Sequence, residues 1–104
     1  MIERYVYVRL HEQYAAERAD IVAHTREVLA SLPGIVQYAV GTPADGHSES
    51  AWDLSIAIRF ASQDDIETFR DNPEHRRLVD EYLKPRMHVI KAWNFQLSNP
   101  LTDD

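Results

Sequence analysis

The sequence predicts an α+β domain in which a four-stranded antiparallel sheet carries helices on one face. Four segments alternate their side chains with the period of two that is typical of β-strands, and two segments repeat apolar residues with the helical period. Along the chain the order is strand, helix, strand, strand, helix, strand. Two β-α-β halves of this kind form one mostly antiparallel sheet with both helices on the same side.

The first half begins with a strand over residues 2–10, in which Tyr5 and Tyr7 point away from an apolar set of alternate residues. Residues 15–32 form a helix whose apolar face contains Ile21, Val22, Thr25, Val28, Leu29 and Leu32. The pair Pro33-Gly34 ends this helix, with Gly34 as its C-terminal cap. A second strand follows over residues 35–41.

The second half opens with a polar, solvated and mobile loop over residues 42–50, and a strand over residues 51–60. Ser62 caps a short helix, and Asn72-Pro73 begins another that runs to about residue 83. The last strand covers residues 88–97. We expect one domain over 1–97, followed by a flexible C-terminal tail over 98–104.

Composition excludes several classes of function. The chain has 104 residues and a formal net charge of −6, without a basic stripe, so nucleic acid and anionic membrane are not expected partners. It has no cysteine, no helical or strand spacing of histidines typical of a metal site, and no phosphate-binding loop, so we expect neither a metal nor a cofactor. No signal peptide or membrane span is recognisable, which predicts a cytoplasmic protein.

Aromatic and large apolar side chains occur in both alternation sets of the strands. Two helices cover only one side of a sheet, so they cannot bury all of Tyr5, Tyr7, Tyr38, Trp52, Trp93 and Phe95. An exposed apolar patch of that size is unusual for a monomer. We therefore predict a homodimer in which two sheets face each other as an eight-stranded barrel, with Tyr7, Tyr38, Trp93 and Phe95 in the interface.

Three segments carry a resemblance to a known family. Phe60-Ala61-Ser62 opens a helix, Asn72-Pro73-Glu74-His75 opens the next, and Lys91-Ala92-Trp93-Asn94-Phe95 ends the last strand. From Tyr5 to Phe95 the chain resembles the stress-responsive A/B barrel (Dabb) family, whose members are dimeric α+β barrels with a ferredoxin-like protomer. One member is the polyketide cyclase that makes olivetolic acid, which works without a cofactor in a pocket between helices and sheet.

The resemblance implies a role for His75, which matches the general base of that cyclase in the Pro-x-His motif. A tyrosine that orients the cyclase's substrate corresponds to Phe69, which has no hydroxyl. Two pocket histidines of the cyclase correspond to Arg4 and Leu54. Olivetolic acid cyclisation itself is therefore not expected, whereas a related proton transfer is.

The candidate site contains His75 as general acid or base, because an imidazole with a pKa near ~6.5 exchanges protons at neutral pH. Around it we expect substrate-binding side chains, some with hydroxyls able to stabilise an enolate: Phe69, Tyr5, Tyr7, Tyr82 and His88. The first hypothesis is that the dimer binds or transforms a small, mostly apolar carbonyl or polyketide-like compound. The alternatives are a non-catalytic dimeric module for stress tolerance or assembly, and a cofactor-independent monooxygenase of the antibiotic-biosynthesis type.

Overall fold

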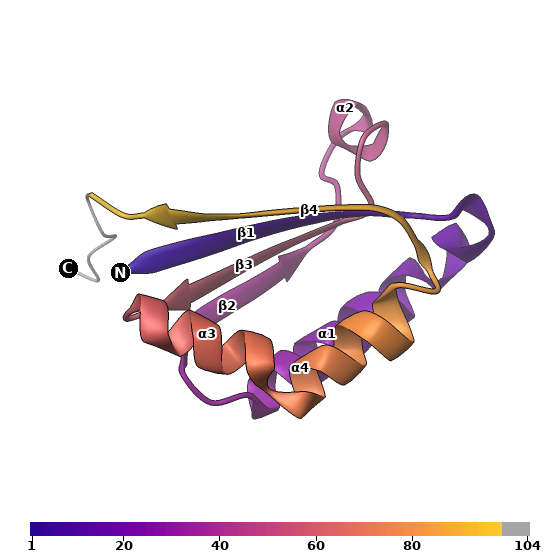
Figure 1. Ribbon diagram of the computed structural model, residues 1–104. Helices are drawn as coiled ribbons and strands as arrows, with labels where there is room; N and C mark the ends of the chain where they lie inside the picture. Colours follow the sequence, from indigo (N-terminus) through magenta and orange to yellow (C-terminus); the bar gives the residue numbers. More distant parts are fainter. Residues whose placement is uncertain (99–104) are drawn as a thin grey trace.

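A computed structural model describes residues 1–98 and contains one four-stranded sheet (Figure 1). The strands lie in the order β2-β3-β1-β4, and every neighbouring pair is antiparallel. Their bounds are Ile2–Leu10 for β1, Ile35–Gly41 for β2, Leu54–Phe60 for β3 and Met87–Gln96 for β4. The predicted fold class is confirmed. The predicted tail, 98–104, lies outside the described residues except for Ser98.

The longer helices all cover the same face of the sheet (Figure 1). They are α1 (Arg18–Ser31), which follows the 3-10 turn η1 (Glu12–Glu17), and the sequence α3 (Gln63–Asp71), α4 (Pro73–Arg77) and η2 (Leu78–Leu83). Ser62 and Asn72 cap α3 and α4 as expected, because each side-chain oxygen accepts a backbone N–H of the first turn. No helix within residues 1–98 is long and apolar enough to cross a membrane.

Two local expectations are wrong. Residues 42–50 contain a short helix, α2 (Gly46–Glu49), on the side of the sheet away from the other helices, and Asp45 caps it by accepting from the Ser48 N–H at 2.8 Å. The strand expected from residue 51 begins only at Leu54, because the Trp52 N–H instead donates to the Ser48 carbonyl.

The end of α1 also differs from its predicted cap. Leu32, the residue before Pro33, is already extended, as the ring of a following proline favours. Gly34 lies two residues beyond that cap with φ at 84°, a conformation that a residue with a Cβ rarely adopts. Proline therefore ends the helix, and glycine turns the chain into β2.

Strand β1 presents two different faces. Its even-numbered residues face the helices, where Val6, Val8 and Leu10 are buried in the core. Its odd-numbered residues face the open side: Tyr5 lies opposite Trp93 of β4, and the ring of Tyr7 lies 6.4 Å from that of Trp93. The open side thus carries a row of aromatic side chains: Tyr5, Tyr7, Trp52, Trp93 and Phe95.

Tyr38 does not belong to this row. It lies directly opposite Ile58, which is buried under the helices, and it packs against the same core. A register irregularity between Ile35 and Gln37 places Tyr38 on the covered face. Tyr38 was expected with the open-face aromatics in the dimer interface, and its position on the covered face contradicts that expectation.

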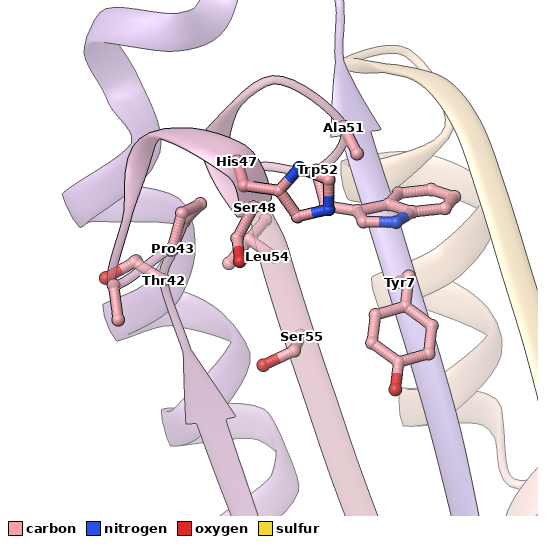
Figure 2. A pocket seen from close by; sticks show the side chains of 10 residues that line it. Tyr7, Thr42, Pro43, His47, Ser48, Ala51, Trp52, Leu54 and Ser55 are labelled. Atoms are coloured by element: carbon pink, nitrogen blue, oxygen red, sulfur yellow. The ribbon is translucent and has the colours of Figure 1, made fainter.

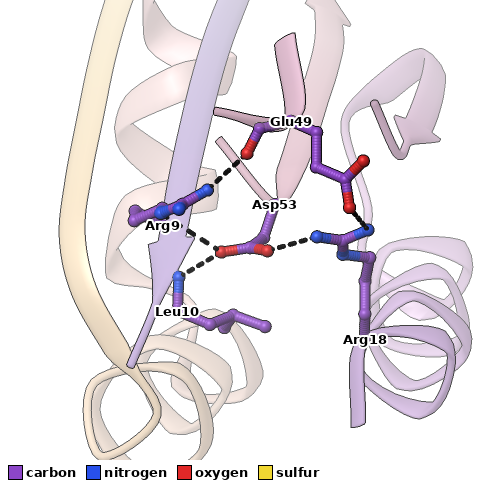
Figure 3. A network of polar contacts seen from close by, with 5 residues as sticks. All are labelled: Arg9, Leu10, Arg18, Glu49 and Asp53. Carbon is purple, nitrogen blue, oxygen red and sulfur yellow. Dashed lines mark hydrogen bonds and ion pairs between the residues drawn. The ribbon is translucent and has the colours of Figure 1, made fainter. Parts of the chain in front are cut away.

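A buried carboxylate joins three elements at one end of the sheet (Figure 3). Asp53 accepts hydrogen bonds from the Leu10 N–H at 2.8 Å and from the Arg18 guanidinium at 2.5 Å. Burial alone would raise the pKa of Asp53, but these hydrogen bonds and the nearby arginines outweigh it, so the pKa lies below its usual value. Arg9 and Arg18 also contact Glu49, which fixes α2 to the end of β1 and the start of α1.

We expect Asp53→Asn to lower the free energy of unfolding by about 1.5–3 kcal/mol, since it removes a charge-assisted hydrogen bond and leaves Arg18 without its buried partner. Urea denaturation at pH 7 measures this. Asp71→Asn is the matched control, because Asp71 is exposed and, in the described part of the chain, pairs only with exposed Arg76. Equal stability of the two variants would contradict the structural role given to Asp53.

Candidate functional site

A small cavity lies between the sheet and the helices. Its volume is about 140 Å³, and most of its wall is aliphatic. The strands contribute Arg4, Val6, Ile56, Ile58 and Ile90, and the helices contribute Thr25, Leu29, Phe69, His75, Leu78, Val79 and Leu83. A concave, mostly apolar site with a few convergent polar groups is the usual form of a small-molecule pocket.

His75 enters the cavity wall from the first turn of α4. Asn72 caps this helix and Pro73 occupies its first position, so the local sequence places His75 one turn from the cap. Its imidazole lies against the Phe69 ring, with centroids 4.1 Å apart. Nδ1 lies 3.4 Å from the Arg70 carbonyl oxygen, which can only accept. In the neutral ring this contact places the proton on Nδ1 and leaves the Nε2 lone pair as the proton acceptor.

The surroundings of His75 favour its neutral form. Burial lowers the pKa of His75 below its usual value, and the charges of Arg4 and Arg76 lower it further, against the opposing effects of the Arg70 carbonyl and Asp80. At neutral pH the side chain is therefore a base that already lacks its second proton. Such a group can take a proton from a bound molecule and return it.

The helix that follows His75 is wider than an α-helix. In η2 the Lys84 N–H donates to the Val79 carbonyl, five residues earlier, at 2.9 Å. Leu78, Val79 and Leu83 of this segment all line the cavity. Wide turns of this kind insert one extra residue in a helix and frequently occur at functional sites.

The structure brings together only part of the predicted site. Phe69 and His75 share the cavity wall, whereas Tyr5 and Tyr7 lie on the opposite face of the sheet. They were expected in the pocket for their hydroxyls, but the alternation of β1 that buries Val6 and Val8 turns both tyrosines away from it.

Tyr82 and His88 do not line the cavity either. The Tyr82 ring packs outside it, 4.0 Å from the His24 ring and 4.2 Å from the Arg86 guanidinium carbon. His88 lies beside His11 near the Asp53 network, with ring centroids 5.5 Å apart. Their positions depend on how the helices pack, which the sequence pattern did not determine.

Two cavity residues were not recognised as site residues. Arg4 appeared only as a departure from the family pattern, and Thr25 only as part of the helix face. The signal for Arg4 was present in the sequence: it is the one charged residue in the alternation set of Ile2, Val6, Val8 and Leu10. Thr25 had no comparable signal, because threonine is common on a buried helix face.

A second hollow lies on the open side, between α2 and the sheet (Figure 2). It is larger, about 330 Å³, and its wall includes Tyr7, His47, Trp52 and Ser55. His47 and Ser55 are exposed and Trp52 belongs to the aromatic row, so this hollow is part of the open face on which we expect the second copy. We therefore place the candidate site in the cavity that contains His75.

Comparison with known families agrees with this architecture. The family model described as the stress responsive A/B barrel domain matches residues 2–96, which is nearly the whole chain. The chain belongs to this family. A search of curated protein sequences found none with significant similarity.

Solved structures of similar proteins show the same fold at low sequence identity. A member of the A/B barrel family from Mesorhizobium loti, described as ferredoxin-like, is 17% identical with a TM-score of 0.78, and 97% of each chain is covered. A dimeric ferredoxin-like protein of unknown function from Thermobifida fusca is 18% identical with a TM-score of 0.79, covering 92% of this chain and 90% of its own. A hydroxynitrile lyase from Passiflora edulis is 18% identical with a TM-score of 0.79, covering 97% of this chain and 96% of its own.

The lowered pKa of His75 predicts a pH dependence of stability. The unfolded chain takes up the His75 proton near pH 6.5, and the folded protein does so only at lower pH. Between these values the unfolded state binds more protons, so the free energy of unfolding falls as the pH falls from 7 to 5.

We expect the His75→Asn protein to lose less stability than the wild type over this interval, as measured by urea denaturation at pH 7 and pH 5. His47→Asn, which changes an exposed histidine, should keep the wild-type difference. Identical pH dependence in the His75→Asn protein and the wild type would show that the imidazole is not desolvated.

Proposed function

We propose that this A/B barrel protein is a homodimer that binds and transforms a small, mostly apolar carbonyl compound, with His75 as general acid and base. The observation that carries the proposal is a desolvated imidazole in the wall of an otherwise aliphatic cavity. A neutral imidazole at pH 7 removes a proton from the carbon next to a carbonyl group, and the resulting imidazolium returns it. This chemistry needs no cofactor.

The size of the cavity favours the smaller members of the expected substrate class. A protein cavity of about 150 Å³ holds one benzene molecule. The cavity volume of about 140 Å³ therefore fits a single ring or a short branched chain rather than a long polyketide. The structural likeness to a hydroxynitrile lyase supports small-molecule chemistry on this fold, and it does not identify the reaction of this chain.

One observation favours the non-catalytic alternative. The Phe69 ring packs against His75 at the place where the resembled cyclase has a tyrosine, so no hydroxyl from this position orients a substrate. In a module that acts only through its dimer surface, the His75 imidazole would have no catalytic role. An assay of proton transfer separates the two functions.

The assay is deuterium exchange of the protons next to the carbonyl group of cyclohexanone and acetophenone in D₂O near neutral pH, followed by NMR. We expect the wild-type protein to accelerate exchange, and His75→Asn to reduce the acceleration by at least about 100-fold, since a positioned base contributes about that much. His47→Asn serves as the control with wild-type exchange. Exchange that is equal in wild type and His75→Asn would favour the non-catalytic module.

The dimer is supported by the aromatic row on the open side. Trp93 and Phe95 are 50% and 56% exposed, although their neighbours Tyr5 and Tyr7 hold them in an ordered row. Large aromatic side chains with so much exposed surface are stabilised by a second apolar surface. The similar protein from Thermobifida fusca is described as dimeric, which agrees with a second copy as the partner.

We expect sedimentation equilibrium at micromolar concentration to give a dimer for the wild type and a monomer for Trp93→Glu, because the new carboxylate would be buried without a partner. Ala30→Glu adds the same charge to an exposed position of α1 and should remain dimeric. A monomeric wild type would refute the proposed assembly.

A further inference from the structure

Arg4 is a cation placed on an apolar wall. It lies in β1 between Ile2 and Val6 and lines the cavity with its side chain on the helix-covered face. Its only hydrogen bond to a side chain within residues 1–98 joins Nη1 to the amide oxygen of Asn94, at 2.9 Å. Most of its five N–H donors are therefore available to another acceptor.

Within the described residues no carboxylate forms an ion pair with Arg4. Glu3, its neighbour in sequence, points to the opposite face and pairs there with Arg59 at 2.7 Å. Burial lowers the pKa of Arg4 below its usual value, and the positive charge of Arg70 lowers it further. A partly desolvated cation without a counter-ion is energetically unfavourable, and a bound anion would relieve it.

The facing wall contains a second unused polar group. Thr25 of α1 is 0% exposed and lines the same cavity, and its hydroxyl oxygen has no hydrogen-bond partner among residues 1–98. Buried polar groups in proteins are nearly always paired, so an orphan hydroxyl at a cavity is a sign of an absent partner. Arg4 on the sheet and Thr25 on the helix thus border one apolar space from two sides.

We propose that the ligand of this cavity is a small carboxylate with an apolar body, bound through its carboxylate by Arg4 and through a second oxygen by Thr25. A guanidinium matches a carboxylate with two parallel N–H donors. This inference rests on the proposed function. Combined with it, carboxylate binding defines the substrate as a short branched or single-ring keto acid. The carbonyl oxygen is then the group that meets Thr25.

The first test compares benzoate with benzamide, which has nearly the same shape and no charge, by NMR titration of the full chain. We expect wild-type protein to bind benzoate at least about tenfold more tightly than benzamide. Arg4→Met should abolish this preference, and Arg4→Lys should keep part of it. Arg26→Gln removes an equal charge from an exposed position of α1 outside the cavity wall and should keep the preference.

The second test uses Thr25→Val, which replaces the hydroxyl with a methyl group of similar volume. We expect it to weaken binding of 3-methyl-2-oxobutanoate several-fold, and to leave unchanged the binding of 3-methylbutanoate, which lacks the ketone. Circular dichroism and the Arg4→Lys protein show whether a loss of binding in Arg4→Met comes from misfolding.

Equal binding of benzoate and benzamide, or a charge preference that survives in folded Arg4→Met, would overturn the inference. Failure here is distinguishable from failure of the proposed function, because binding reports on Arg4 and deuterium exchange reports on His75. Carboxylate binding that depends on Arg4, without exchange that depends on His75, refutes only the acid–base role. The reverse result refutes only the carboxylate site.

Discussion

Strand β1 has to satisfy two environments at once, and the rest of the structure depends on how it does so. It lies between β3 and β4, so both of its edges are hydrogen-bonded. Its even-numbered side chains meet the helices and its odd-numbered side chains meet the open side. A shift of register by one residue would exchange the two sets and place Tyr5 and Tyr7 in the core, so the alternation fixes the register of the whole sheet.

The candidate site follows from one irregularity in that alternation. Arg4 occupies a position where its neighbours are aliphatic, and it brings a charge to the wall that also contains His75. The same charge contributes to the low pKa of His75. The cation and the neutral base are thus parts of one arrangement, in which a positively charged group keeps the nearby imidazole ready to accept a proton.

The order and type of the main elements were predictable because the periodicities of the strands and of α1 are strong. The predictions failed where local hydrogen bonding decides the backbone: Asp45 caps an unexpected helix, and Trp52 bonds to α2 rather than entering β3. At the site, His75 and Phe69 were found because a family resemblance pointed to them. Tyr5 and Tyr7 were chosen for their hydroxyls, although their odd-numbered positions already opposed that choice.

The positions of Tyr82, His88 and Thr25 could not be predicted from the sequence, for another reason. Each depends on contacts between elements far apart in the chain, such as the packing of the Tyr82 ring against His24 of α1. Periodicity shows which face of a helix is apolar, but it does not show which residues of a neighbouring helix contact that face. A cavity is the space left between packed elements. Its lining can therefore be predicted only once the packing of those elements is known.

The wide turn of η2 determines part of the cavity wall. One residue more than an ordinary helix needs is accommodated between Val79 and Lys84. A wide turn of this kind accommodates its extra residue locally, within a single turn of the helix. Val79 and Leu83 both line the cavity, so a change of chain length by one residue in this turn would alter the cavity wall directly.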